Sequence, residues 1–173
     1  GHNGEEAAGW WVLAGFNDGH TQLDMEGCRL VTADDCSTGT RAGVCGGTTT
    51  IGDFATQDKG GTLNDALDAW HKKADGKCSC NYAFHRAITD WNDQVKAELP
   101  EMFRRGVTSF KAYMAYDALK VNDAETLAIL QSLQPFGGIL GVHRETGLLV
   151  TEPQARPKAP AQFDPEVHPV SRP

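Results

Sequence analysis

Three side chains that could bind a metal or act in catalysis stand out along the chain: His20, Lys111 and His143. His20 follows a predicted strand at residues 10–15, Lys111 interrupts the apolar run SFKAYMAY (109–116), and His143 ends the run GILGV. Parallel sheets gather their functional groups at the carboxyl ends of the strands, so these three side chains could share one site. A lone histidine is more often a hydrogen-bonded structural residue, so neither histidine decides the matter alone.

Lys111 is the least expected of the three, because burial of an ammonium group is costly unless the group is paired or chemically altered. In one interpretation its side chain reaches outward and keeps its charge in solvent. In the other, desolvation lowers its pKa and leaves a neutral amine, which can take up carbon dioxide as a carbamate. The carbamate oxygens can bridge two metal ions, and metals about 3.5–4 Å apart can activate water against an amide carbonyl. Imidazoles from neighbouring strand ends would complete such a site.

The composition of the 173 residues is that of a globular, acidic protein. Sixteen Lys and Arg residues stand against 23 Asp and Glu, which gives a formal charge of -7, and 40% of the residues are hydrophobic. This length suits one domain. The negative charge argues against nucleic acid or an anionic membrane as partner, because both attract clustered Lys and Arg. No apolar run approaches the ~20 residues of a membrane span.

The cysteines do not predict a disulfide framework. Five of them occur, at positions 28, 36, 45, 78 and 80, which is an odd number without the spacing of a redox or zinc pair. We therefore expect reduced thiols and a cytoplasmic protein.

Apolar or β-branched runs alternate with amphipathic helical stretches, which predicts an α/β fold with a parallel sheet. We expect strands at 10–15, 48–54, 81–88, 109–116 and 138–142, and helices at 34–45, 62–73, 91–105 and from 122. Pro100 should kink or end the third helix. Residues 151–173 hold six of the eight prolines and should form an extended tail. The predicted organisation is a loose lead-in (1–9), a folded domain (10–150), which the resemblance described below makes a partial barrel, and this tail.

Four segments resemble the dihydropyrimidinase and D-hydantoinase family of cyclic amidohydrolases. They are VLAGFNDGHTQLDM (12–25), VTADDCSTGTRAGVCGGTTTIGDF (31–54), GVTSFKAYMAY (106–116) and GGILGVHRETG (137–147), and the similarity covers roughly residues 10–147 in the family's order.

The resemblance implies a (β/α)8 TIM-type barrel with two divalent metal ions, zinc by preference and manganese as an alternative. It implies that Lys111 is the carboxylated lysine that bridges the metals. His20 matches a ligand of the first metal and His143 a ligand of the second. Tyr116 matches the tyrosine that donates a hydrogen bond to the oxyanion of the tetrahedral intermediate.

The chain departs from the family pattern at several positions. Gln22 replaces the second histidine of the family's His-x-His pair, and an amide is a poor zinc ligand. Arg144-Glu145-Thr146-Gly147 stands where Ala-Glu-Asn-Gly is usual, and Ala14-Gly15-Phe16 where Pro-Gly-Gly is usual. The family's remaining histidine ligand and its aspartate, which serves as metal ligand and general base, belong to later strands. His85 and Asp53 lie on matching strands, and we expect them to be structural.

A complete barrel takes about 250 residues, so this chain should hold about five of the eight strand–helix units. We therefore expect an N-terminal part of a hydrolase that opens hydantoin or dihydropyrimidine rings to N-carbamoyl amino acids, nearly inactive alone. Its partner would be a small cyclic amide, and the full-length protein a homo-oligomer. Two alternatives remain: a non-catalytic relative that works as a scaffold, which Gln22 favours, and another amidohydrolase such as an allantoinase.

Overall fold

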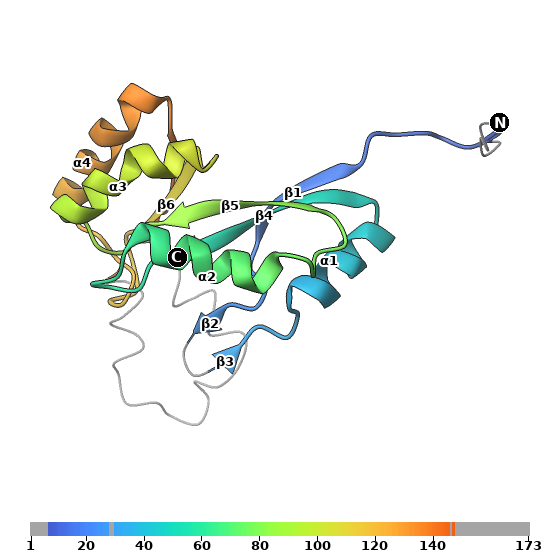
Figure 1. Cartoon of the computed structure of the whole chain (residues 1–173), viewed down its shortest axis with the longest axis horizontal. Coiled ribbons are helices and arrows are strands. Elements are labelled where there is room, and N and C mark those ends of the chain that lie inside the picture. Colours follow the sequence, from blue (N-terminus) through green and yellow to red (C-terminus); the bar gives the residue numbers. More distant parts are fainter. Residues whose placement is uncertain (1–6, 28–29, 146, 148–173) are drawn as a thin grey trace.

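The computed structural model describes residues 7–27, 30–145 and 147, which form a curved parallel sheet with helices between successive strands (Figure 1). The strands are β1 (Phe16–Thr21), β4 (Thr48–Thr56), β5 (Asn81–Ala87), β6 (Ser109–Tyr113) and β7 (Ile139–His143), paired in this order. All four neighbouring pairs are parallel. The sheet is therefore half of a barrel, with five strands as expected.

The helices begin where the sequence signals predict. They are α1 (Cys36–Cys45), α2 (Leu63–Ala74), α3 (Asp93–Arg104) and α4 (Asp123–Leu133), and the 3-10 helix η1 (Gln134–Phe136) follows α4. Asp35, Thr62 and Asn122 each accept a hydrogen bond from a backbone N–H of the first turn of their helix. These side chains satisfy donors that have no partner within the helix.

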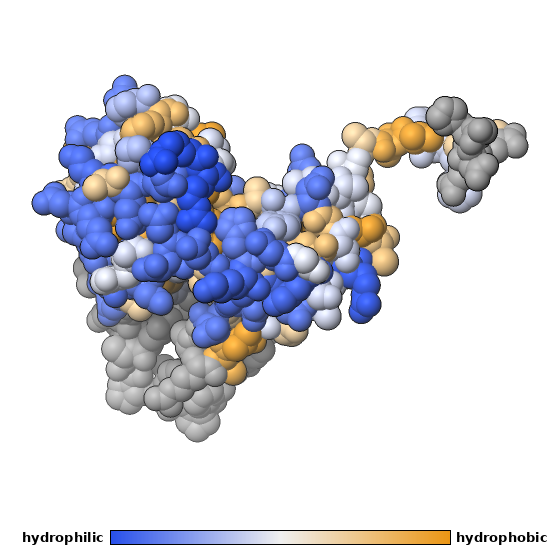
Figure 2. Space-filling view, viewed as in Figure 1, coloured by the Kyte–Doolittle hydropathy of each residue, from blue (hydrophilic) through white to orange (hydrophobic). Residues whose placement is uncertain are grey.

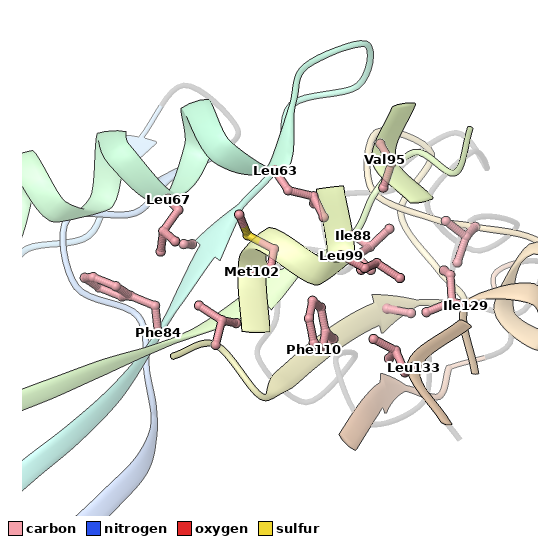
Figure 3. Packing of buried hydrophobic residues seen from close by; sticks show 14 of the residues in the cluster. Leu63, Leu67, Phe84, Ile88, Val95, Leu99, Met102, Phe110, Ile129 and Leu133 are labelled. Atoms are coloured by element: carbon pink, nitrogen blue, oxygen red, sulfur yellow. The ribbon is translucent and has the colours of Figure 1, made fainter. Parts of the chain in front are cut away.

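The hydrophobic core lies between the helices and one face of the sheet (Figure 3). Leu67 of α2, Met102 of α3 and Ile129 of α4 are almost fully buried, as is Phe110 of β6. Because side chains alternate along a strand, Phe110 faces this core while Lys111 faces the opposite side of the sheet. That opposite side becomes the concave surface of the half-barrel.

The predicted strand at residues 10–15 is wrong. The first strand begins only at Phe16, the register partner of Thr48 in β4, and no strand among the described residues pairs with the residues before it. Trp10 and Trp11 are 80% and 91% exposed. They belong to an apolar arm that extends away from the sheet (Figure 2).

Pro100 does not end α3, which continues to Arg104. The proline itself is exposed, and the buried side chains of Leu99 and Met102 anchor the helix on either side of it.

A short antiparallel pair, β2 (Glu26–Gly27) and β3 (Leu30–Val31), was not expected. The tail at 151–173 and most of the lead-in lie outside the described residues. Within the described ranges, no helix is long and apolar enough to cross a membrane.

Candidate active site

The strand register brings functional side chains into one row on the concave face of the sheet. Phe54 of β4 lies opposite His85 of β5. Lys111 lies opposite Gly141, and two residues further along Tyr113 lies opposite His143. Residues two positions apart on a strand share a face, so Lys111 and Tyr113 both project toward this concave side. The rings of Phe54 and Tyr113 lie between the three residues singled out from the sequence: His20, Lys111 and His143.

His20 lies one residue before the end of β1, exposed at the rim of the sheet. Its ring packs against Phe54, with 4.6 Å between the ring centroids. The Nζ atom of Lys111 is 5.6 Å from the centroid of the same Phe54 ring. One phenylalanine thus separates the first predicted metal ligand from the predicted bridging lysine.

Lys111 is half-buried, and its ammonium group contacts rings rather than carboxylates. Its Nζ lies 5.6 Å from the centroid of Phe54 and 5.5 Å from that of Tyr113. Among the described residues no carboxylate forms an ion pair with it. Desolvation by burial lowers the pKa of Lys111, and this is the environment that favours a neutral amine.

His143, Tyr116 and Glu145 form a hydrogen-bonded group at the end of β7. The Nε2 atom of His143 lies 2.8 Å from Glu145 Oε2, and the Tyr116 hydroxyl donates to the same oxygen at 2.9 Å. The ring of Tyr113 completes the row, 5.8 Å from that of His143. Glu145 was not singled out from the sequence; its spacing of two residues from His143 was the available signal.

The backbone of Tyr116 is left-handed, with a φ of 69°. Such a conformation at a bulky residue costs on the order of 1–3 kcal/mol and is concentrated at functional sites. The Tyr116 carbonyl accepts hydrogen bonds from the N–H groups of Leu119 and Lys120, both at 2.8 Å, which hold the turn. The turn directs the phenol back toward β7, where its ring lies 5.4 Å from that of His143.

His85 and Asp53 form hydrogen bonds with other segments of the chain. His85 Nε2 lies 2.9 Å from the Gly19 carbonyl, so it is the donor, and Nδ1 then accepts from the Ser109 hydroxyl at 2.8 Å. The ring therefore ties β1 to β6 next to His20. Asp53 is buried on the opposite face and accepts the N–H of Leu23 at 2.9 Å. Burial raises the pKa of Asp53, while this hydrogen bond acts against the increase.

The donors on the concave face fit part of a metal centre. Among the residues that the structure describes, no group of three His, Cys, Asp or Glu side chains could hold a metal ion. The donor set is instead two imidazoles, His20 and His143, and the amine of Lys111, with the exposed Gln22 nearby in sequence. Imidazoles suit zinc, and a carbamate on Lys111 would add two oxygen ligands. The fit therefore requires that lysine to be modified and further ligands to come from outside these residues.

No protein-family model matches the chain. Individual proteins do match. D-hydantoinase of Streptomyces coelicolor is 39% identical over 164 residues, which are 94% of this chain and 35% of that protein. Dihydropyrimidinase of Rattus norvegicus is 39% identical over 170 residues, 97% of this chain and 33% of that one. The chain thus spans about a third of the length of the curated relatives it matches.

Solved structures agree with the sequence relatives. D-hydantoinase from Bacillus sp. AR9 superposes with a TM-score of 0.89 and 39% identity, covering 96% of this chain and 37% of that one. Dihydropyrimidinase from Brevibacillus agri gives a TM-score of 0.85 at 38% identity, over 93% of this chain and 35% of that one. The half-barrel is therefore similar to the corresponding third of these solved chains.

Proposed function

Because this chain belongs to the dihydropyrimidinase and D-hydantoinase family of cyclic amidohydrolases, we propose that it supplies part of a site that opens hydantoin or dihydropyrimidine rings. The products would be N-carbamoyl amino acids, and the reaction would depend on divalent metal. The relatives at 39% identity carry the names of enzymes that act on such rings. The observation that carries the proposal is the position of Lys111 between two rings, Phe54, which contacts His20, and Tyr113, which contacts His143. Among the described residues it has no carboxylate ion pair.

Lys111 would become the bridging ligand. Its lowered pKa increases the fraction of neutral amine, whose nitrogen attacks the carbon of carbon dioxide. The nitrogen then loses a proton to water, and the product is a carbamate anion. The negative charge that replaces the ammonium would be stabilised by the metal ions it binds. The aromatic rings on either side would keep bulk water from the group and hold its stem in place.

His20 and His143 would each hold one of two divalent ions, zinc or manganese. When bound, these ions polarise the ring carbonyl and activate water for attack. His20 is exposed at the end of β1 and accessible to an ion. His143 already has a partner in Glu145, 2.8 Å from its Nε2 atom. Coordination through Nε2 would therefore require Glu145 to release the imidazole.

Tyr116 would stabilise the oxyanion that forms as the ring carbonyl becomes tetrahedral. Its hydroxyl donates to Glu145 Oε2 at 2.9 Å, so the donor is already directed toward the end of β7. With substrate present, the hydroxyl would exchange this carboxylate for the developing oxyanion. Glu145 would thus hold both Tyr116 and His143 in place before the substrate and metal bind.

A hybrid enzyme tests the proposal, because the chain spans only a third of its relatives. This chain replaces the matching segment of D-hydantoinase from Geobacillus stearothermophilus, to which it is 38% identical. Ring opening of hydantoin and dihydrouracil is measured with zinc or manganese and bicarbonate, and bound metal is counted. We expect metal-dependent opening that Lys111→Met abolishes and Tyr116→Phe lowers by a factor of about 100, the typical loss for one oxyanion donor.

Lys72→Met is the matched control, since Lys72 is an exposed residue of α2. It should leave the rate unchanged. A folded hybrid that binds metal but opens neither ring would refute the proposal, and opening of allantoin alone would reassign the substrate. A folded hybrid with well under one metal per chain would favour a non-catalytic scaffold. The cytoplasmic location and the homo-oligomer stay predictions.

A further inference from the structure

Two cysteines from distant parts of the sequence meet on the helical side of the sheet, away from the proposed active site. Cys36 is the first residue of α1, and Cys78 lies in the connection between α2 and β5. Cys36 is 4% exposed and belongs to the hydrophobic core, and Cys78 is half-buried against that core. Each thiol affects the pKa of the other, so the two side chains lie near each other.

The backbone around both cysteines is held by a polar link. The Thr40 hydroxyl, one turn along α1, donates to the Cys36 carbonyl at 2.5 Å. The same Thr40 oxygen accepts the N–H of Ser79 at 2.9 Å. Thr40 is fully buried, so water does not compete for these bonds. The start of α1 and the residue after Cys78 are thereby fixed side by side.

We propose that Cys36 and Cys78 are a redox-active dithiol that closes to a disulfide with low-molecular-weight disulfides such as oxidised glutathione. The reduced form is the one described, in which both cysteines are free. The bond would connect the start of α1 to the segment that precedes β5. This inference does not depend on the proposed hydrolase activity.

The order of the two steps follows from exposure. Cys78 is the more accessible thiol, so as a thiolate it attacks one sulfur of oxidised glutathione and releases the other as glutathione thiolate. Cys36 then loses its proton to solvent, and its sulfur attacks the Cys78 sulfur of the mixed disulfide. A second glutathione leaves. The two protein sulfurs are oxidised, and one glutathione disulfide is reduced to two thiols.

Peptide mapping by mass spectrometry tests the proposal. The folded chain is treated with oxidised glutathione, quenched with acid, alkylated and digested without reductant. We expect a cross-linked peptide between Cys36 and Cys78 and the loss of two of the five thiols. Cys36→Ser should stop the reaction at glutathione on Cys78, whereas in Cys78→Ser the buried Cys36 should stay a free thiol.

Cys80→Ser is the matched control, because Cys80 is only two residues from Cys78 and is also half-buried. This variant should give the same cross-link as the wild-type chain. A dominant link that joins Cys78 to Cys80, or that includes Cys28, would overturn the proposal. So would glutathione that persists on Cys78 in the wild-type chain while Cys36 remains reduced. The wild-type map decides the matter even where a variant fails to fold.

Discussion

Replacement of Arg86 by methionine should make the protein more stable. Arg86 lies in β5 and is fully buried. Its Nη1 atom donates to the Ala55 carbonyl at 2.5 Å. Its Nε and Nη2 atoms have no hydrogen-bond partner among the described residues. A buried cation with incomplete hydrogen bonding keeps much of its desolvation cost.

The size of the effect follows from the electrostatics of the site. Burial lowers the pKa of Arg86 to about 9, although the Glu98 carboxylate acts in the opposite direction. Each unit by which the pKa is shifted corresponds to about 1.4 kcal/mol. Keeping the guanidinium protonated in the folded state therefore costs on the order of 4–5 kcal/mol at neutral pH. Methionine removes this cost, but it also loses the bond to Ala55 and leaves some volume unfilled. We expect a net gain of about 1–3 kcal/mol.

Removal of Arg86 does not leave Glu98 without partners. The Glu98 Oε2 atom accepts the N–H of Leu63 at 2.6 Å and that of Asn64 at 3.4 Å, at the first turn of α2. Arg86 and Glu98 form no ion pair among the described residues, so the cost of leaving a buried charge without its partner does not arise here. These two hydrogen bonds remain in the variant, which is why we expect a gain and not a loss.

Urea unfolding followed by circular dichroism measures the change. Arg104→Met is the matched control: Arg104 is exposed at the end of α3, and its ion pair with Glu101 is worth at most about 1 kcal/mol. The gain in the free energy of unfolding of Arg86→Met over the wild-type protein should be largest below pH 9. It should shrink above pH 9, because the folded wild-type protein then releases the Arg86 proton before the unfolded state does. A variant less stable than wild type by 1 kcal/mol or more would refute this reasoning.

Three further predictions concern other sites. Asp35→Ala should lower the free energy of unfolding by about 1 kcal/mol, because two N–H groups of the first turn of α1 lose their acceptor; an unchanged urea midpoint would contradict the capping assignment. Burial lowers the pKa of Lys111, so competitive acetylation measured across pH should show that Lys111 begins to react at a lower pH than an ordinary lysine. If Lys111 begins to react only at the pH of an ordinary lysine, its ammonium group is solvated. Burial raises the pKa of both Cys36 and Cys78, so closure of the disulfide should be slow at neutral pH and accelerate about tenfold per pH unit through the alkaline range; a rate that does not change with pH would argue against thiolate attack.

Much of the local structure could be predicted from the sequence, because its causes are local. Helix starts depend on one polar side chain and the next three residues, and the helices predicted from 34, 62 and 122 begin directly after the capping residues Asp35, Thr62 and Asn122. Alternation of strands and helices predicted the parallel sheet. Lys111 was recognised because a cation within an apolar strand conflicts with its surroundings, and that conflict is visible without coordinates.

The missed features depend on residues that are distant in sequence. WWVLAG has the composition of a buried strand, yet a strand requires a neighbour, and β4 begins too late to pair with residues 10–15. Glu145 gains its importance only because the turn at Tyr116 brings a hydroxyl from another strand to the same oxygen. Arg86 looks ordinary within NYAFHRAI until the helices cover it.

The sequence by itself determined which segments form helices or strands, and that a lysine with unusual surroundings lies among possible ligands. Only the tertiary structure decided which side chains share an environment: His20 and Lys111 on one Phe54 ring, and Cys36 beside Cys78. The physical reason is range. Capping and periodicity act within a few residues, whereas strand register, burial and the pKa of a side chain are set by groups that only the folded chain brings together.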